Sequence, residues 1–167
     1  SIVGLGFLEV MNVTLTKESI HYQHMRMKGE NPIKLANPVS TEYAIMRQSL
    51  LPGLMKNLAD NKHESFPQRL FEVSDVGKIS ARLETMCERR LNAAAVSSHS
   101  WANFTEVKSF AEALLASLSM KNWKIKEAKH PSFLDGRTAA VHVNGRPLGI
   151  LGEVHPEVLN NFELENP

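Results

Sequence analysis

Alternating hydrophobic and polar residues mark two neighbouring runs near the C-terminal end of the chain, at residues 137–144 and 146–154. Asn144 and Gly145 join them, and this dipeptide favours a type I′ turn because both of its positions need a positive φ. The pattern therefore predicts a β-hairpin. Its inward face would carry alternate residues of both runs, namely Ala139, Val141 and Val143 from the first and Leu148, Ile150, Gly152 and Val154 from the second.

Glycine and histidine residues indicate how this hairpin is held. Gly149 and Gly152 interrupt the second run, and a glycine inside a strand indicates a bend or the close approach of other backbone. His130 and His155 lie at the two ends of the hairpin, and each precedes a proline that restricts it to extended or turn geometry. We expect both imidazoles to hydrogen-bond to nearby backbone.

Two segments have the periodicity of helices. In residues 49–63 apolar residues recur at three- and four-residue spacing, Ser49 is a suitable N-cap, and Pro52 falls in the first turn, where its missing amide has no partner to lose. Residues 104–119 carry a single apolar stripe.

The second helix also has a start signal, because Asn103 and Glu106 are spaced as in a capping box. A shorter helical turn is predicted to begin at Pro156, since proline suits the first position of a helix.

The other apolar runs predict strands. They occupy residues 7–15, 34–38, 69–76, 89–97 and 121–129, with a last strand from residue 162 onward. Residues 16–31 are polar and predict a loop or a short helical turn, and residues 77–88 predict a connection between strands. About seven strands, often following one another directly, and two good helices indicate an α+β fold with a largely antiparallel sheet flanked by helices.

Composition narrows the class of protein. The 167 residues suit one domain, and 19 basic against 18 acidic residues argue against a strong overall field for nucleic acid or membrane, although they leave room for a local patch. The single cysteine, Cys87, excludes an internal disulfide and suits the reducing cytoplasm, where we expect the protein to act. No apolar run approaches the roughly 20 residues that span a bilayer, so we expect no membrane partner.

Both ends of the chain look cut. It begins at Ser1 without a methionine, and it ends directly after a new apolar alternation at Phe162 and Leu164. We therefore expect residues 1–167 to be a single domain that is excised from a longer polypeptide and truncated at both ends.

Candidate catalytic and metal-binding residues are few. His21 and His24 are three residues apart, but no neighbouring Cys, Asp or Glu completes a known ligand spacing, so we expect no metal site. Cys87 has only Arg89 and Arg90 to lower its pKa, and we interpret it as a structural thiol. No glycine-rich loop for phosphates is present.

Residues 121–129 carry lysines at positions 121, 124, 126 and 129, with Trp123 among them. This stripe has two interpretations. Lysines interleaved with an aromatic residue can bind a nucleic-acid strand. Lysine on an edge strand, however, more commonly prevents aggregation between sheets.

Three stretches, taken in order, resemble one family. They are MRQSLLPGLMKNLADNK with PQRLFEVSDV (46–62 and 67–76), NFTEVKSFAEALLASL (103–118), and HPSFLDGRTAAVHVNGRPLGILGEVHPEVLNNFELENP (130–167). They are similar to the C-terminal catalytic-like module of the phenylalanyl-tRNA synthetase β subunit, in its archaeal and eukaryotic form. The similarity extends from GFLEVMNVTLT (6–16) to the end of the chain.

This resemblance implies a class II aminoacyl-tRNA synthetase fold in which the β module is not catalytic and holds no cofactor. In the family, the α subunit activates phenylalanine with ATP and magnesium, and an α2β2 heterotetramer acts on tRNA. The resemblance makes segment 6–16 and the apolar face of helix 49–63 candidate contacts with the α subunit; on the helix these are Leu50, Leu51, Leu54 and Leu58. It also makes Lys124 and Lys126 candidate tRNA contacts.

The sequence shows whether the residues that an active class II site requires are present. An active class II site needs an Arg-x-Glu shortly after the turn of its second motif, but RLFEVSDV is followed by residues 77–80, GKIS. Arg82 and Glu84 do have this spacing, further on in the predicted connection. The alternative function is therefore a degenerate but active ATP-dependent adenylating domain that uses Arg82, Glu84 and Arg137.

Overall fold

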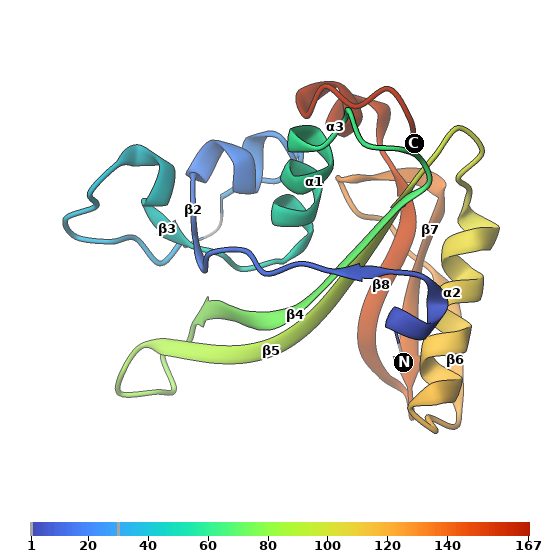
Figure 1. Ribbon diagram of the computed structural model, residues 1–167. Coiled ribbons are helices and arrows are strands. Elements are labelled where there is room, and N and C mark those ends of the chain that lie inside the picture. The colour runs from blue at the N-terminus through green and yellow to red at the C-terminus, as the bar shows by residue number, and fades with distance from the viewer. Residues whose placement is uncertain (1, 30) are drawn as a thin grey trace.

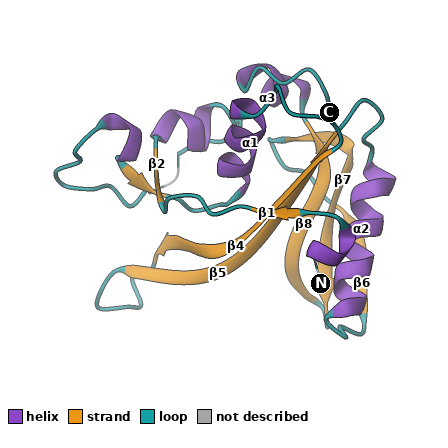
Figure 2. Cartoon of the chain, viewed as in Figure 1, coloured by secondary structure: helices purple, strands orange, loops and turns teal. Residues whose placement is uncertain are grey.

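The computed structural model describes residues 2–29 and 31–167 and has an α+β architecture (Figures 1 and 2). Within these residues the strands are β1 (Leu8–Glu9), β2 (Leu15–Thr16), β3 (Ile45–Met46), β4 (Gln68–Ile79), β5 (Cys87–Ser98), β6 (Trp123–Glu127), β7 (Phe133–Val143) and β8 (Arg146–Val154). The α-helices are α1 (Leu51–Asp60), α2 (Phe104–Ser117) and α3 (Pro156–Asn161), and the short helical turns are η1 (Val3–Leu5), η2 (Ser19–Gln23) and η3 (Thr41–Tyr43). The α+β class with mostly antiparallel pairing is confirmed, but the strands form separate sheets, ordered β1-β4-β5, β2-β3 and β6-β7-β8.

The β4–β5 hairpin is the longest element and projects away from the rest of the molecule (Figure 1). Its strands pair antiparallel from Gln68 opposite Ser98 to Ile79 opposite Cys87. The strands predicted at 69–76 and 89–97 are confirmed, and both are longer than predicted. The connection predicted at 77–88 is reduced to residues 80–86, because pairing continues almost to the turn.

The single strand predicted at 7–15 is wrong. This segment forms only β1, which pairs parallel to β4, and β2, which pairs antiparallel to β3. Between them the backbone leaves the sheet, because the amide of Asn12 donates to a carboxylate oxygen of Glu72, at 3.2 Å, instead of to a neighbouring strand. An alternating pattern cannot reveal that a distant side chain replaces the ladder.

Helix α1 covers one face of the β4–β5 sheet and forms a first core with α3 and the segment around η2 (Figure 1). The buried residues of this core are Met25, Leu54, Met55, Leu58, Val96, Val158 and Phe162. The predicted helix is confirmed and is shorter at both ends than 49–63. The predicted N-cap at Ser49 is wrong, because Leu50 holds that position without a side-chain cap; the hydroxyl of Ser49 accepts a hydrogen bond from the amide of Leu51 at 3.3 Å. Pro52 lies in the first turn, as predicted.

Helix α2 lies against the β6-β7-β8 sheet and forms a second core. Its buried residues are Leu115, Ala139, Val141 and Leu151. The predicted N-cap is confirmed, because the side-chain oxygen of Asn103 accepts from the amide of Glu106 at 3.1 Å. The edge strand predicted at 121–129 is confirmed as β6, and the predicted helical turn from Pro156 is confirmed as α3.

The β7–β8 hairpin turns at Asn144 and Gly145 as predicted, with φ of 51° and 79°. The predicted face of its second strand is wrong, because Leu148 and Ile150 are exposed while Leu151 is buried. A register shift between Val141 and His142 places Gly149, not Leu148, opposite Val141. One extra residue in a strand moves every later side chain to the other face, so Leu151 takes the core position beside Ala139.

The remaining details of this hairpin follow its sequence. A Cβ at Gly152 would lie 2.9 Å from the carbonyl oxygen of Arg137, so the predicted close approach is confirmed there; Gly149 has no such neighbour. The Nδ1 of His130 accepts from the amide of Ser132 at 3.2 Å, and the Nδ1 of His155 accepts from the amide of Glu157 at 3.1 Å. Both predicted histidine anchors are confirmed.

Three predictions on short segments have different outcomes. The helical turn predicted in 16–31 is confirmed as η2, but the strand predicted at 34–38 is only a single bridge between Lys34 and Ile45. The strand predicted from residue 162 is wrong. The amide of Phe162 bonds to the carbonyls of Val158 and Leu159, so Phe162 closes α3 and buries its ring in the first core.

Candidate functional site

The apolar face of α1 belongs to the interior of this chain. Leu50, Leu54 and Leu58 are at most 3% exposed, and Leu51 is partly buried beside them. These side chains stabilise the chain itself, each by about 1.5–3 kcal/mol if fully buried. Their assignment to a subunit interface stays a prediction, and in this conformation a partner would meet the solvent side of α1 first.

The N-terminal segment, in contrast, exposes large apolar side chains. Leu8 is 66% exposed, Met11 93% and Val13 63%. Leu8 lies in β1, at the edge of the β1-β4-β5 sheet, and the other two lie in the connection from β1 to β2. We call these three residues the N-terminal edge. Three large exposed apolar side chains gathered within six residues are a mark of a surface that another protein covers.

A buried ion pair fixes this edge to the sheet. The Arg47 guanidinium lies 2.7 Å from Glu72 Oε1, and both side chains are at most 4% exposed. Glu72 Oε2 also accepts from the side-chain amide of Asn12 at 2.8 Å, and Arg47 donates to the carbonyl of Asp75 at 3.1 Å. The cluster joins three segments that are remote in sequence, and only the folded chain brings it together.

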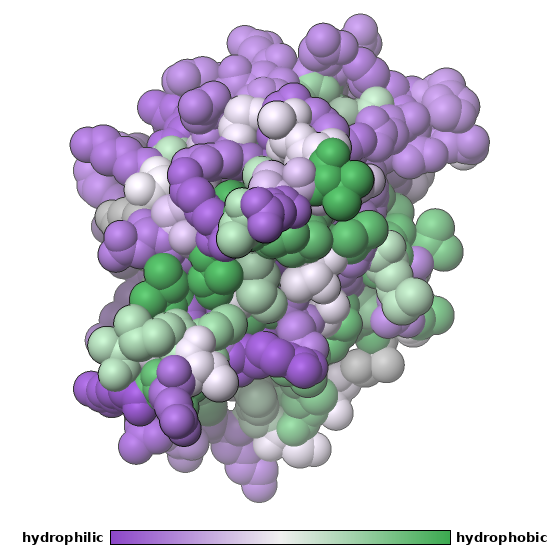
Figure 3. All heavy atoms as spheres, turned by 90° about the vertical axis from the view of Figure 1, so that its left-hand side faces the viewer, coloured by the Kyte–Doolittle hydropathy of each residue, from purple (hydrophilic) through white to green (hydrophobic). Residues whose placement is uncertain are grey.

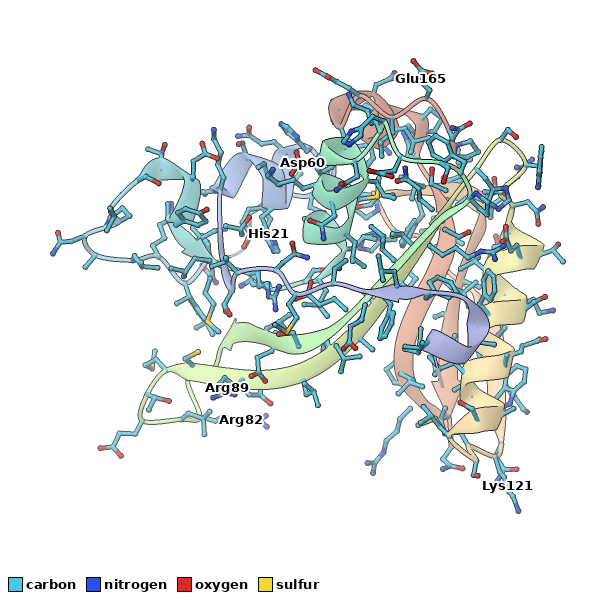
Figure 4. All side chains as sticks on the ribbon, in the orientation of Figure 1. His21, Asp60, Arg82, Arg89, Lys121 and Glu165 are labelled. Carbon is cyan, nitrogen blue, oxygen red and sulfur yellow. The ribbon has the colours of Figure 1, made fainter. Side chains whose placement is uncertain are left out.

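His21 lies beside this cluster, packed near α1 (Figure 4). Burial, and then the positive charge of Arg47, lower the pKa of His21 from 6.5 to about 4. The imidazole is therefore neutral at physiological pH, and its Nε2 accepts a hydrogen bond from the amide of Gln48 at 3.1 Å. Its role is to satisfy this backbone amide, as for most buried polar groups.

A second polar cluster surrounds the start of α2. Glu106 receives Arg69 at 3.0 Å on one oxygen and lies 2.7 Å from His99 Nε2 on the other. Arg69 and His99 line a small pocket of about 190 Å³ whose walls include the exposed rings of Phe66 and Trp101. The sequence indicated Glu106 only as a capping residue, so the cluster was missed. The positive charge of Arg69 is neutralised by Glu106, so the cluster is suited to joining the start of α2 to the sheet.

The open face of the β4–β5 sheet, on the side away from α1, is apolar in its middle. Val73 and Leu91 are 43% and 72% exposed, and Ala93 and Ala95 are exposed beside them. Arg89, further along this face, pairs with Asp75. Among the described residues of this face, no basic side chain without an acidic partner is available to bind a phosphate.

The structure does not bring together Arg82, Glu84 and Arg137, the three residues proposed for the alternative function as an adenylating domain. Arg82 and Glu84 lie in the loop at the tip of the β4–β5 hairpin, where Figure 4 shows Arg82 close to Arg89. Arg137 lies on β7, from which the tip projects away (Figure 1), and it pairs with Glu153 at 2.6 Å. Adenylation needs cations fixed together on one triphosphate, and this arrangement does not provide them.

Only Lys124 and Lys126 of the lysine stripe fall within β6, and they share one face of the strand. Lys124 and Lys126 are exposed, whereas Trp123 turns to the opposite face and packs in the second core. Trp123 therefore does not accompany the lysines as the sequence suggested. The two lysines line a concavity on β6 and β7, and their role as tRNA contacts stays a prediction.

Within residues 2–29 and 31–167, no group of three or more His, Cys, Asp or Glu side chains is placed to hold a metal ion. No helix within them is long and apolar enough to cross a membrane. Hydrophobic side chains do reach the surface in patches between hydrophilic ones, as seen from the side to which the β4–β5 tip projects (Figure 3).

Comparisons with known proteins agree on one similarity. A family model described as the phenylalanyl tRNA synthetase beta chain CLM domain matches residues 1–167. The phenylalanine–tRNA ligase beta subunit of Archaeoglobus fulgidus is 44% identical over 99% of this chain and 29% of its own length, and that of Methanopyrus kandleri is 44% identical over 100% and 28%. The same subunit of Methanocaldococcus jannaschii is 40% identical over 99% and 30%. The chain thus spans less than a third of each of these relatives.

Proposed function

Because this chain belongs to the family of the phenylalanyl tRNA synthetase beta chain CLM domain, we propose that it is the C-terminal catalytic-like module of a phenylalanine–tRNA ligase β subunit. It has a class II synthetase-like fold without catalytic activity. Its function is to assemble with the catalytic α subunit, in an α2β2 ligase that attaches phenylalanine to tRNA in the cytoplasm. ATP and magnesium are bound by the α subunit and not by this module.

The N-terminal edge is the observation that carries this proposal. Leu8, Met11 and Val13 present apolar surface to solvent, although the rest of their segment is fixed through Asn12 to the buried Glu72. A rigid segment that displays apolar side chains loses little conformational freedom when a partner covers it, which favours binding. The structure thus supports the segment 6–16 as a subunit contact better than the buried leucines of α1.

The open face of the β4–β5 sheet supports the lack of catalysis. Transition-state stabilisation in adenylation needs preorganised cationic donors around the phosphates. At the centre of this face the chain has Val73, Ala93 and Ala95 instead. An apolar sheet face of this kind is suited to contact with protein and not to binding of a triphosphate.

Co-purification of the complete β subunit with its α subunit tests the proposal. We expect Met11→Asp/Val13→Asp to weaken the complex by about 100-fold or more, since each buried apolar side chain of this size contributes at least about 1.5 kcal/mol. Size-exclusion chromatography over a dilution series measures the change. The control is Val39→Asp/Tyr43→Asp, which alters two other exposed apolar residues, in and near η3.

Dissociation of the first variant alone, with its melting temperature unchanged, supports the N-terminal edge as the α-subunit contact. An intact complex at all concentrations with the first variant refutes this assignment. Titration of the complete β subunit with ATP and magnesium tests the second part, and micromolar binding that is lost on Arg82→Ala would refute the absence of catalysis.

A further inference from the structure

The open face of the β6–β7 pair, opposite the face that packs on α2, carries a polar concavity. Its lining residues come from both strands, from the residue before β6 and from the hairpin turn: Asn122, Lys124, Lys126, His142, Asn144 and Gly145. Every lining residue other than Gly145 offers a polar side chain. The concavity lies at the opposite end of the molecule from Arg82 and Arg89, near Lys121 (Figure 4).

The strand register brings these side chains together. Lys124 pairs with His142, and Lys126 pairs with Ala140. The two lysines therefore point to the same face as the imidazole of His142, and the residue opposite Lys126 is the small Ala140. Residues two apart on a strand are separated by about 7 Å. That separation is comparable to the distance between neighbouring phosphates along a nucleic-acid strand.

The charge of the concavity is not neutralised by the chain. Among the described residues, neither Lys124 nor Lys126 forms an ion pair, whereas six other lysines each contact a carboxylate; these are Lys17, Lys34, Lys56, Lys62, Lys108 and Lys129. The chain as a whole carries a formal charge of only +1. The two unpaired ammonium groups therefore make this face of β6 locally positive, although the net charge of the chain is small.

Protection of an edge strand explains the lysines alone. It does not explain why the imidazole of His142 and the amides of Asn122 and Asn144 converge on the same concavity. The Nδ1 of His142 is buried and has no hydrogen-bond partner among the described residues. A buried polar atom without a partner calls for an explanation beyond the fold itself, such as a bound ligand or water.

We propose that this concavity binds the phosphodiester backbone of an RNA. Lysine ammonium groups and asparagine amides are common phosphate-binding groups, and the amides also suit the 2′-hydroxyl of ribose. A protein partner would need an apolar centre, which the lining residues do not provide. The choice of RNA over DNA rests on the proposed function, because the substrate of the proposed ligase is a tRNA.

The position of Trp123 defines the kind of recognition. Its ring packs in the second core with α2, on the opposite side of the sheet from Lys124 and Lys126. No aromatic residue lines the concavity, so bases cannot stack there. Binding is consequently through charge, independent of base sequence and strongly dependent on salt.

The test measures the dissociation constant of the complete β subunit for a fluorescent tRNA transcript across a range of salt concentrations. We expect Lys124→Gln/Lys126→Gln to reduce the slope of log affinity against log salt by about 1.4–1.8, since each phosphate contact contributes about 0.7–0.9. The control is Lys56→Gln/Lys108→Gln, which removes the same charge from exposed positions on α1 and α2. We expect the control to leave the slope unchanged.

Three results would overturn the proposal: an unchanged slope in Lys124→Gln/Lys126→Gln, an equal change in the control variant, or equally strong competition by polyglutamate and by RNA. The last would identify the concavity as a site for any polyanion. The measurement does not need the α subunit. Failure of RNA binding is therefore distinguishable from failure of subunit assembly, which the chromatography of the N-terminal edge variants reports.

Discussion

Replacement of Glu72 by leucine should be among the most destabilising single changes in this chain. The variant leaves the Arg47 guanidinium, whose side chain is 4% exposed, without its counter-charge. It also removes the acceptor for the backbone and side-chain amides of Asn12. A buried charge that loses its partner costs about 3–5 kcal/mol. A domain of this size has only about 5–15 kcal/mol of stability in total.

Urea denaturation followed by circular dichroism measures this loss. With a slope of about 2 kcal/mol per molar urea, the expected midpoint for Glu72→Leu is about 1.5–2.5 M lower than that of the wild type. Asp60→Asn is the control, because it breaks the exposed ion pair with Lys56 and should cost less than about 1 kcal/mol.

The double variant Arg47→Met/Glu72→Leu separates the two causes. If the uncompensated guanidinium dominates, removal of both charges should recover a large part of the loss, since apolar replacements of buried ion pairs are often neutral. If the Asn12 hydrogen bonds dominate, no recovery is expected. A Glu72→Leu midpoint that stays within the error of the wild type would refute the role of the pair altogether.

Three further predictions concern other parts of the chain. The pKa of His21 is lowered to about 4 by burial, so the unfolded state binds more protons than the folded state between pH 4 and 6.5. The contribution of His21 to stability should be complete above about pH 6.5 and should decrease by about 3 kcal/mol toward pH 4. His21→Gln should flatten this part of the pH–stability curve, and parallel curves for the two proteins would contradict the assignment. Gly152→Ala should cost about 1–3 kcal/mol in thermal unfolding, because the new methyl group meets the carbonyl oxygen of Arg137, whereas Gly149→Ala should cost less. Asn103→Ala should remove about 1 kcal/mol by loss of the cap on the Glu106 amide, and an unchanged melting temperature would show that the cap is dispensable.

The proposed site shows how far sequence reasoning reaches. The lysines of β6 could be identified as candidates from their density in the sequence alone. Whether these lysines lie beside His142 and Asn144 depends on the register between β6 and β7. That register is set by the packing of the sheet against α2. The same packing turns Trp123 away from the lysines. In the folded chain two of these lysines line a polar concavity, and Trp123, which the sequence had placed among them, is not part of it.

Local interactions are what the sequence determined by itself. Each of these features depends on atoms only a few residues apart: the Asn144–Gly145 turn, the Asn103 cap, Pro52 in the first turn of α1 and the two histidine anchors. The energies of such contacts depend on local backbone geometry, which residue type and spacing largely specify.

The tertiary structure decided whatever depends on remote partners. The break in the predicted strand at 7–15 comes from Glu72, which lies 60 residues from Asn12. The inward side of β8 is set by the extra residue opposite β7, which places Leu151 rather than Ile150 in the core. An alternating pattern allows either face of a strand to be buried, so a shift of one residue, with the best total packing, makes the choice.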